Sequence, residues 1–199
     1  SFSNKNSLPK QVIHGWLGKR LLKKSSFHVT SNMEKVAIES IISPKRIITI
    51  SNFVVLAGRV SEERHEYSDD MPLKLLFFSR IEEKKGLDIL LNALNSVTVP
   101  YRLTIAGDGD GDYIDKLKAI AVNRGIADRI SWIGFQGANK FEVLQQHDLM
   151  VLPSHDENFG NVVIESLSAG TPVLLSRYVG LAEYVKANNM GWVCELDEN

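Results

Sequence analysis

The second half of the chain alternates between short apolar runs and longer amphipathic stretches. The apolar runs, which are typical of buried parallel strands, lie at about 73–79, 101–106, 129–134, 148–152, 172–175 and 191–194. Apolar residues at helical spacing fill the intervals at about 86–96, 111–125, 138–146, 161–169 and 181–188. Because strands that alternate with helices form parallel sheets through right-handed crossovers, the pattern predicts an α/β fold with helices on both faces of the sheet.

The N-terminal part of the chain shows a shorter alternation of the same kind. Phe27–Thr30 has the composition of a short strand, and Arg46–Ile50 has that of a second one. Ser31 is followed three residues later by Glu34, which is the spacing of a capping box. The spacing predicts a helix over about 32–40.

Two charged stretches flank these elements. Residues 9–24 place apolar side chains at helical spacing beside a basic face made of Lys10, Lys19, Arg20, Lys23 and Lys24. A basic amphipathic helix can lie on an anionic membrane, but such stripes are more common on helices that pack against a neighbour, and we favour that interpretation. Residues 61–72 are charged and lack apolar periodicity, so they are the best linker candidate.

Composition narrows the classes of function. The 199 residues carry a net charge of −1, which argues against a general nucleic-acid binder because phosphate binding needs a basic excess. The single cysteine, Cys194, cannot form an internal disulfide, which fits a reducing compartment. No apolar run approaches the roughly 20 residues of a transmembrane helix, and Ser1–Lys10 is too polar for a signal peptide. The sequence therefore predicts a cytoplasmic protein.

Polar clusters follow five of the predicted strands at their carboxyl ends, where open α/β sheets bind ligands. In chain order these clusters are Arg80 with Lys85, the glycines Gly107, Gly109 and Gly111, the run Gly134–Gln136, the run Ser154–Gly160 and the run Ser176–Gly180. Loops collect polar residues in general. A cluster after each of five consecutive strands nevertheless predicts one composite site at this edge of the sheet.

Arg80 and Lys85 stand at the turn between the first of these strands and the helix that opens near Gly86. Two cations at such a turn suit a diphosphate, because arginine offers a forked donor, lysine a point charge and the helix start oriented N–H groups. The alternative is that both are solvated and paired with Glu82 or Glu83, and the pair alone does not decide between the two.

The glycine-rich run IAGDGDGDYI matches no phosphate-binding motif. A dinucleotide-binding GxGxxG that starts at Gly107 would need glycine where Asp112 stands, and the chain contains no GxxxxGK[ST]. The aspartates of the run would repel a pyrophosphate, and they do not meet the EF-hand pattern for calcium. A tight turn that admits the edge of a ligand is the better interpretation.

Glu157 and Glu165 lie eight residues apart, on either side of the helix start at Val162. A carboxylate pair fits a glycosidase, but carboxylates also accept hydrogen bonds from the vicinal hydroxyls of a ribose or pyranose. A diphosphate at the helix start would repel both carboxylates, so they should face sugar hydroxyls instead. The alternative is a charge that complements the helix dipole and a solvated side chain, although the helix around Glu165 has little polar surface.

Other catalytic chemistries find little support in the sequence. The five histidines show no zinc spacing and Cys194 has no partner, so no metal site is predicted. Ser154 lacks the glycine elbow of a serine hydrolase, and we interpret it as a loop hydroxyl.

The run PSHDENFGNVVIESLSAGTPVL resembles the E-x7-E signature of the retaining glycosyltransferases of family four, also called glycosyl transferases group one. The stretches SRIEEKKGLDILLNAL, LTIAGDGDGDYIDKL and ISWIGFQGANKFEVLQQHDLMVLPS agree with that family in order and spacing. The resemblance covers about Leu73–Val193 and implies the Rossmann-like, donor-binding C-terminal half of a GT-B fold. Residues 27–52 resemble the segment of that family that precedes the second Rossmann-like domain of the GT-B fold.

The resemblance implies a role for each candidate residue. Arg80 and Lys85 would hold the donor diphosphate and stabilise the leaving group. Glu157 would meet the hydroxyls of the transferred sugar, and Glu165 would accept those of the ribose. The other donor-binding positions that it implies are Phe159, Gly160, Asn161, Val162, Gly134, Gln136, Gly107 and Gly109. The family generally needs no metal, so we expect a nucleotide-diphosphate sugar as substrate, no cofactor, and transfer with retention of configuration.

Members of this family are about twice as long as the chain, so we expect a fragment with little or no activity alone. Residues 1–52 would be a remnant of the N-terminal acceptor domain, 53–72 a linker, and 73–199 the donor domain without its C-terminal tail. A saccharide or lipid-linked acceptor would bind through the missing domain, with peripheral contact to the cytoplasmic face of a membrane. Two alternatives stay open: a non-catalytic nucleotide-binding or signalling module, and a dinucleotide oxidoreductase, which Asp112 disfavours.

Overall fold

A computed structural model describes residues 19–58 and 71–196 of the chain. Of the predicted helix over 9–24, only α2 (Lys19–Leu22) falls within this range, and residues 61–70 of the predicted linker lie outside it. The chain divides into two compact units, Ser1–Asn52 and Phe53–Asn199, and each is taken by itself. Across the two described ranges, no helix has both the length and the apolar character that crossing a bilayer requires.

The first unit contains the short strands and the helix that the sequence predicts. β1 (Ser26–Val29) pairs in parallel with β2 (Arg46–Thr49), and α3 (Asn32–Ile41) connects them. The hydroxyl of Ser31 accepts the N–H of Glu34 at 3.2 Å, and the Glu34 carboxylate accepts the N–H of Thr30 at 2.8 Å. The reciprocal bond of the predicted capping box therefore forms one residue earlier than expected.

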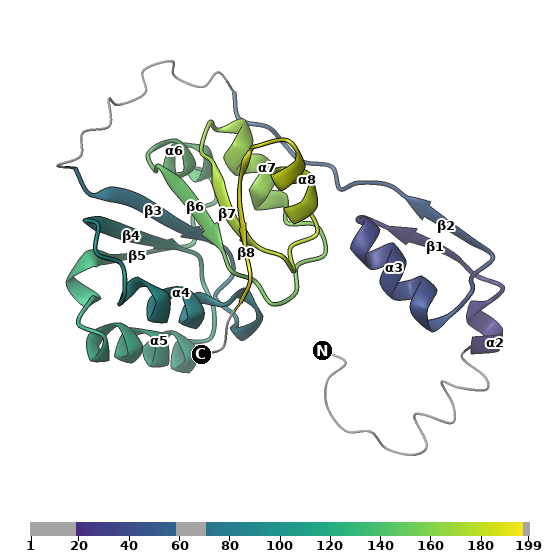
Figure 1. Cartoon of the computed structure of the whole chain (residues 1–199), viewed down its shortest axis with the longest axis horizontal. Helices are drawn as coiled ribbons and strands as arrows, with labels where there is room; N and C mark the ends of the chain where they lie inside the picture. The colour runs from purple at the N-terminus through teal and green to yellow at the C-terminus, as the bar shows by residue number, and fades with distance from the viewer. Residues whose placement is uncertain (1–18, 59–70, 197–199) are drawn as a thin grey trace. The chain divides into compact units, whose positions relative to one another are not determined.

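The second unit contains a six-stranded parallel sheet in the order β5-β4-β3-β6-β7-β8 (Figure 1). Its strands are β3 (Leu73–Phe78), β4 (Tyr101–Ala106), β5 (Ile130–Gly134), β6 (Leu149–Leu152), β7 (Val173–Ser176) and β8 (Gly191–Cys194). Its helices are α4 (Leu87–Leu94), α5 (Gly111–Asn123), α6 (Lys140–Gln145), α7 (Asn161–Ser168) and α8 (Ala182–Ala187), with 3-10 turns η2 (Glu83–Lys85) and η3 (Ala127–Arg129). Each of these strands and α-helices begins and ends within two residues of its predicted limits, whereas the two 3-10 turns were not predicted.

Two hydrophobic clusters cover the two faces of this sheet. Leu75 and Phe77 of β3 pack with the buried sides of α4 and α5, whereas Leu76 between them packs with residues of α6, α7 and α8. This alternation is the period of a strand that is buried on both faces. Figure 1 shows α4 and α5 on one side of the sheet and α6, α7 and α8 on the other. The predicted α/β fold, a parallel sheet with helices on both faces, is confirmed.

The strand order creates a crevice at the carboxyl edge of the sheet. From β3 the chain moves outward to β4 and β5, and then returns to place β6 on the opposite side of β3. The loops after β3 and β6 therefore leave the sheet in opposite directions, and ligands of open α/β sheets bind at such a switch point.

Candidate functional site

A cleft of about 780 Å³ opens at the carboxyl edge, beside the switch point between β3 and β6. Its lining residues are Phe78, Ser79, Arg80 and Lys85 from the end of β3 onward, Ala106, Gly107, Asp108 and Gly109 from β4, Phe135, Gln136, Gly137 and Lys140 from β5, and Glu157, Gly160, Asn161, Val162 and Glu165 from β6. Four of the five predicted clusters thus meet in one cleft. The prediction of a fifth contribution is wrong, because Ser176–Gly180 does not line it.

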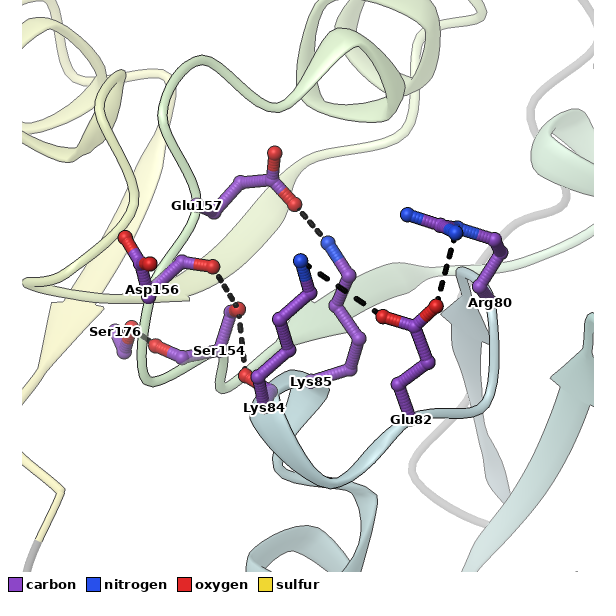
Figure 2. A network of polar contacts seen from close by, with 8 residues as sticks. All are labelled: Arg80, Glu82, Lys84, Lys85, Ser154, Asp156, Glu157 and Ser176. Atoms are coloured by element: carbon purple, nitrogen blue, oxygen red, sulfur yellow. Dashed lines mark hydrogen bonds and ion pairs between the residues drawn. The ribbon is translucent and has the colours of Figure 1, made fainter. Parts of the chain in front are cut away.

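The loop after β7 instead supports the loop after β6. The N–H of Glu157 donates to the carbonyl of Tyr178 at 3.1 Å, and the N–H of Gly180 donates to the carbonyl of Glu157 at 2.7 Å. The hydroxyl of Ser176 donates to the carbonyl of Ser154 (Figure 2). These bonds fix the backbone of Glu157 and leave its carboxylate to face the cleft.

Lys85 is enclosed, with 7% of its surface exposed, and its ammonium is ion-paired with Glu157 (Figure 2). It ends the turn η2, and Gly86 follows it in the left-handed region with a φ of 68°. A Cβ on Gly86 would lie 2.0 Å from the carbonyl oxygen of Pro153. Glycine is therefore required here for the loops after β3 and β6 to meet, and their meeting brings Lys85 to Glu157.

Hydrogen bonds tie the same two loops together. The hydroxyl of Ser154 and the N–H of His155 each donate to the carbonyl of Lys84 at 2.8 Å. Ser154 is fully buried in this contact. Its prediction as a loop hydroxyl is confirmed.

Arg80 lies at the rim of the cleft in a different environment. Its side chain is 72% exposed, and its Nη1 lies 2.9 Å from Oε1 of Glu82. Lys84 approaches the other oxygen of Glu82 at 3.8 Å, and Figure 2 shows Arg80 and Lys84 turned toward Glu82 while Lys85 points to Glu157. The two predicted cations therefore differ. Arg80 is solvated and paired with Glu82, which is the alternative that the sequence allowed for both, whereas Lys85 is enclosed and paired with Glu157.

Glu165 lies on α7 and faces the cleft with 12% of its side chain exposed. Its Oε1 is 2.6 Å from the ammonium of Lys140, the first residue of α6. Lys140 is not among the residues predicted from the sequence, because its partner is 25 residues away and a lysine near a helix start is usually solvated. The one signal in the sequence is its place at the start of the helix after β5, at the same edge as the other candidates.

The first turn of α7 borders the cleft. Asn161 and Glu165, which are one turn apart, line it, whereas Val163 is fully buried on the core side. Gly160 precedes the helix with a φ of 81°, and a Cβ there would come within 3.2 Å of the Val163 side chain. Phe159 is 5% exposed and does not line the cleft.

The glycine-rich run leads from β4 to α5 without an assigned turn, so the predicted tight turn is not seen, and Gly109 forms a parallel bridge with Ile81 instead. A Cβ on Gly107 would lie 1.8 Å from the carbonyl oxygen of Ser79, and one on Gly109 would lie 2.1 Å from that of Ile81. Both glycines line the cleft. Glycine is thus required at both positions because the loop after β4 approaches the loop after β3 closely.

Only some residues of the loop after β5 line the cleft. Gly134 accepts the N–H of Gly107 at 2.9 Å but does not line the cleft. Gln136 lines it, and its amide nitrogen donates to the carbonyl of Ile133 at 2.7 Å. Phe135 also lines the cleft, with 77% of its surface exposed.

The charged lining residues are balanced in sign. The cations are Arg80, Lys85 and Lys140, and the carboxylates are Asp108, Glu157 and Glu165. The cleft can therefore donate to an anion and accept from hydroxyls at the same time. In the part of the chain that the structure describes, no three His, Cys, Asp or Glu side chains are grouped to hold a metal ion. The absence of a metal from the reaction stays a prediction.

A second cleft of about 510 Å³ adjoins the first and shares Arg80, Asp108 and Gly109 with it. Its charged lining has an acidic excess, since the carboxylates of Glu82, Glu83, Asp108 and Asp110 outnumber the cations Arg80 and Lys116. Burial, together with the negative charges of Asp88 and Glu83, raises the pKa of Tyr113 in this cleft to about 12. Its acidic lining makes it unsuited to a diphosphate, unlike the first cleft.

Comparison with known proteins gives a family and a fold. Residues 60–198 match the sequence model of the family described as glycosyl transferases group 1. The D-inositol 3-phosphate glycosyltransferase of Segniliparus rotundus is 36% identical over 111 residues, which are 53% of this chain and 25% of that protein. The chain spans about a quarter to a half of the length of the curated relatives that it matches.

Solved structures show the same fold. The apo form of the lipopolysaccharide outer core galactosyltransferase WaaB has a TM-score of 0.72 and 24% identity, with 86% of this chain and 48% of that chain covered. Anabaena Alr3699/HepE in complex with UDP and glucose has a TM-score of 0.75 and 23% identity, with 96% and 55% covered. The parallel sheet with helices on both faces thus matches that of GT-B glycosyltransferases.

Proposed function

The chain belongs to the family of glycosyl transferases group 1, and from this membership and the geometry of its cleft we propose that it binds the nucleotide-diphosphate sugar of a retaining glycosyltransferase. The observation that carries the proposal is the enclosed pair of Lys85 and Glu157 at the switch point of the sheet. This pair offers a cation for a diphosphate directly beside an acceptor for sugar hydroxyls.

Lys85 is the cation that we expect to contribute most to binding the diphosphate. Because it is enclosed, its attraction to phosphate oxygens is screened less than that of an exposed charge. The exposed guanidinium of Arg80 would exchange Glu82 for two phosphate oxygens in a forked arrangement. Both cations would then stabilise the charge that develops on the leaving diphosphate, which is the electrostatic task of a metal in other enzymes.

The first turn of α7 would add a positive helix end to this site. The helix dipole makes the N-terminal end of a helix positive, which favours an anion there. Gly160, Asn161 and Val162 line the cleft at this point. The arrangement supports a phosphate group at the start of α7.

The two glutamates would divide the hydroxyls of the donor. Each repels a diphosphate, so each should face a sugar. Glu157, which is paired with the diphosphate-binding Lys85, would meet the transferred sugar, and Glu165 on α7 would meet the ribose. Neither is assigned as a nucleophile, which agrees with a front-face displacement that retains configuration.

The whole reaction is a further part of the proposal. The complex of HepE with UDP and glucose supports UDP as the first nucleotide to test, and the outer core galactosyltransferase WaaB supports a role in polysaccharide or glycolipid synthesis. A saccharide or lipid-linked acceptor would then bind with the help of further polypeptide. In this scheme residues 1–52 belong to the acceptor domain, 53–72 link the domains, and 73–199 bind the donor. The cytoplasmic location stays a prediction.

Titration calorimetry with UDP, GDP and ADP tests the proposal. At least one should bind, and Lys85→Met should weaken it roughly 30- to 150-fold, because a hydrogen bond to a charged group is worth about 2–3 kcal/mol. Lys84→Met is the matched control: the same charge is lost one residue away, from a side chain that is 50% exposed and does not line the cleft. Nucleotide affinity that is absent, or equally weakened by both changes, would contradict the proposal and favour a module without a donor site.

A further inference from the structure

Lys140 is a cation of the cleft to which the proposed function gives no task. It is the first residue of α6, its side chain is 27% exposed, and it lines the cleft beside Glu165. Its ammonium is 2.6 Å from Oε1 of Glu165 and 5.2 Å from the centre of the Phe141 ring. A side chain of α6 is thus bonded to a side chain of α7 at the edge of the sheet where the cleft opens.

This pair is not explained as a device for stability. A positive charge in the first turn of a helix is opposed by the positive end of the helix dipole, so Lys140 stands at a locally unfavourable position. Both partners of the pair are largely withdrawn from water, and the loss of hydration offsets much of their attraction. Lys140 is thus unfavourable for its own helix, and its ion pair adds little to the stability of the protein. A residue of this kind points to a function at the cleft.

The contact determines how the Glu165 carboxylate is turned. An isolated glutamate side chain has several rotamers of similar energy, and its terminal torsion is broad. A charge-assisted hydrogen bond to Oε1 limits that torsion and with it the direction of Oε2. Because α6 follows β5 and α7 follows β6, a residue of one helix thus limits the orientation of a carboxylate on the neighbouring helix.

We propose that Lys140 is a positioning residue: it holds one oxygen of Glu165 so that the carboxylate meets the ribose hydroxyls of the nucleotide, and it thereby sets the preference for ribose over deoxyribose. The inference rests on the proposed function, in which Glu165 accepts the ribose hydroxyls. A carboxylate in a fixed orientation can accept from two vicinal hydroxyls together. A 2′-deoxynucleotide lacks one of them, so it measures that contact without changing the base or the diphosphate.

The test is titration of the chain with UDP, GDP and ADP, each against its 2′-deoxy counterpart. In the unaltered protein the deoxynucleotide should bind about 10-fold or more weakly, because it loses a hydrogen bond to a charged group. Lys140→Met should lower the affinity for the ribonucleotide about 10-fold and that for the deoxynucleotide less than about 3-fold. The preference for ribose should therefore shrink, and Lys140→Arg, which keeps the charge and the donor, should restore it.

The Glu165→Gln variant, used as the parent for a second change, shows whether Lys140 acts through Glu165. With Glu165→Gln present there is no carboxylate to orient, so Lys140→Met should change neither affinity further by more than about 2-fold. A full effect of Lys140→Met in that background would mean direct contact with the nucleotide and would overturn the positioning role. An unchanged preference for ribose in the single variant Lys140→Met would overturn it as well.

Lys118 offers a matched control. It too has an ion pair, with Asp115 at 3.7 Å, and an aromatic contact, with the Trp132 ring at 5.8 Å, but it lies on α5 and does not line the cleft. Lys118→Met should leave the preference for ribose unchanged. A protein that binds none of the three ribonucleotides would contradict the proposed function itself, whereas binding without a ribose preference that depends on Lys140 would contradict only this inference.

Discussion

The two edges of the six-stranded sheet both carry hollows, but their polar groups have different partners. At the amino edge, hollows of about 460 and 520 Å³ open beside the starts of β4 and of β7 and β8. There Arg102 donates to the carbonyl of Asp128 at 2.7 Å, and Thr171 donates to that of Leu144 at 2.6 Å. At the carboxyl edge, Lys85 pairs instead with the carboxylate of Glu157 in the loop after β6, and Lys140 pairs with that of Glu165 on α7.

The difference shows what marks a ligand site in this molecule. A side chain that bonds the protein's own backbone already has a partner, as Thr171 does in its buried bond to Leu144 and Arg102 in its exposed bond to Asp128. A lysine and a glutamate that meet across a cleft both lose hydration, and the pair adds little to stability. The partners of the polar groups, more than the size of the hollows, therefore favour the carboxyl edge for the proposed donor site.

Gly86→Ala should have the largest effect, because it combines a strained backbone with a collision. Ala in the left-handed region costs about 1–2 kcal/mol, and the overlap with Pro153 should add about 1–3 kcal/mol. The shift that relieves it would move Lys85 away from Glu157, so nucleotide affinity should also fall. Urea unfolding and nucleotide titration of the same variant measure both losses.

Gly125 supplies the matched control for that change. It too is left-handed, with a φ of 66°, but a Cβ there meets no atom within 4 Å. Gly125→Ala should cost only the backbone strain and leave nucleotide binding unchanged. Equal losses of stability in both variants would show that the contact between the loops after β3 and β6 is not the constraint.

Glu165→Gln should weaken nucleotide binding about 10-fold, or about 1.4 kcal/mol, because a neutral amide accepts more weakly than a carboxylate. The midpoint of thermal unfolding should change little, because the amide oxygen of the new side chain can still accept from the Lys140 ammonium, whose side chain is 27% exposed to water. Calorimetric titration and a melting curve check the two statements. If the variant unfolds while its nucleotide affinity equals that of the unaltered protein, Glu165 is a structural residue.

Arg80→Ala should weaken nucleotide binding less, by roughly 3- to 10-fold, since the exposed side chain already has Glu82 as a partner. The effect should shrink as salt is added, because exposed charges are screened. Arg102→Ala at the amino edge is the control with the same change in charge, and it should have no effect on binding at any salt concentration. Equal effects of the two variants would mean that only the net charge of the protein matters.

Protonation of His147 should make the free energy of unfolding depend on pH, without any effect on nucleotide binding. Burial lowers its pKa, which outweighs the opposing effects of a hydrogen bond to the Val143 carbonyl and the nearby Asp148, and Lys74 lowers it further. The unfolded chain therefore binds the proton more readily, and stability should fall as the pH drops below about 6.5. In urea unfolding at several pH values, His147→Gln should flatten that slope. A slope unchanged by this substitution would contradict the assignment to His147.

The fold could be predicted from the sequence because each strand and helix is encoded by the pattern of apolar residues within its own segment. The six strands are short apolar runs, and each α-helix of the second unit begins within two residues of its expected start. Glu157 could also be predicted as a site residue, because it lies in the loop that follows a buried strand. In these cases the periodicity and the edge of a parallel sheet are enough.

The rest of the site depends on contacts between distant residues. Lys84 and Lys85 are adjacent in the sequence, but the 3-10 turn and the left-handed Gly86 send one to solvent and the other to Glu157. Lys140 was missed for the same reason, since its partner stands on another helix. The loop Ser176–Gly180 was assigned to the cleft because it follows a strand, but β7 lies one strand beyond the switch point and its loop supports Glu157 instead.

The central claim is that a nucleoside diphosphate binds at the carboxyl edge of the sheet between the loops after β3 and β6. The most direct measurement is a map of backbone amide NMR shifts of the 22.2 kDa chain as the nucleotide that binds in calorimetry is added. We expect the shifts to concentrate at residues 79–86, 107–109, 135–140 and 157–165 and to spare the amino edge. Shifts centred on 98–102 and 128–129 or on 170–172 and 189–192, or no shifts with any of the three nucleotides, would contradict it.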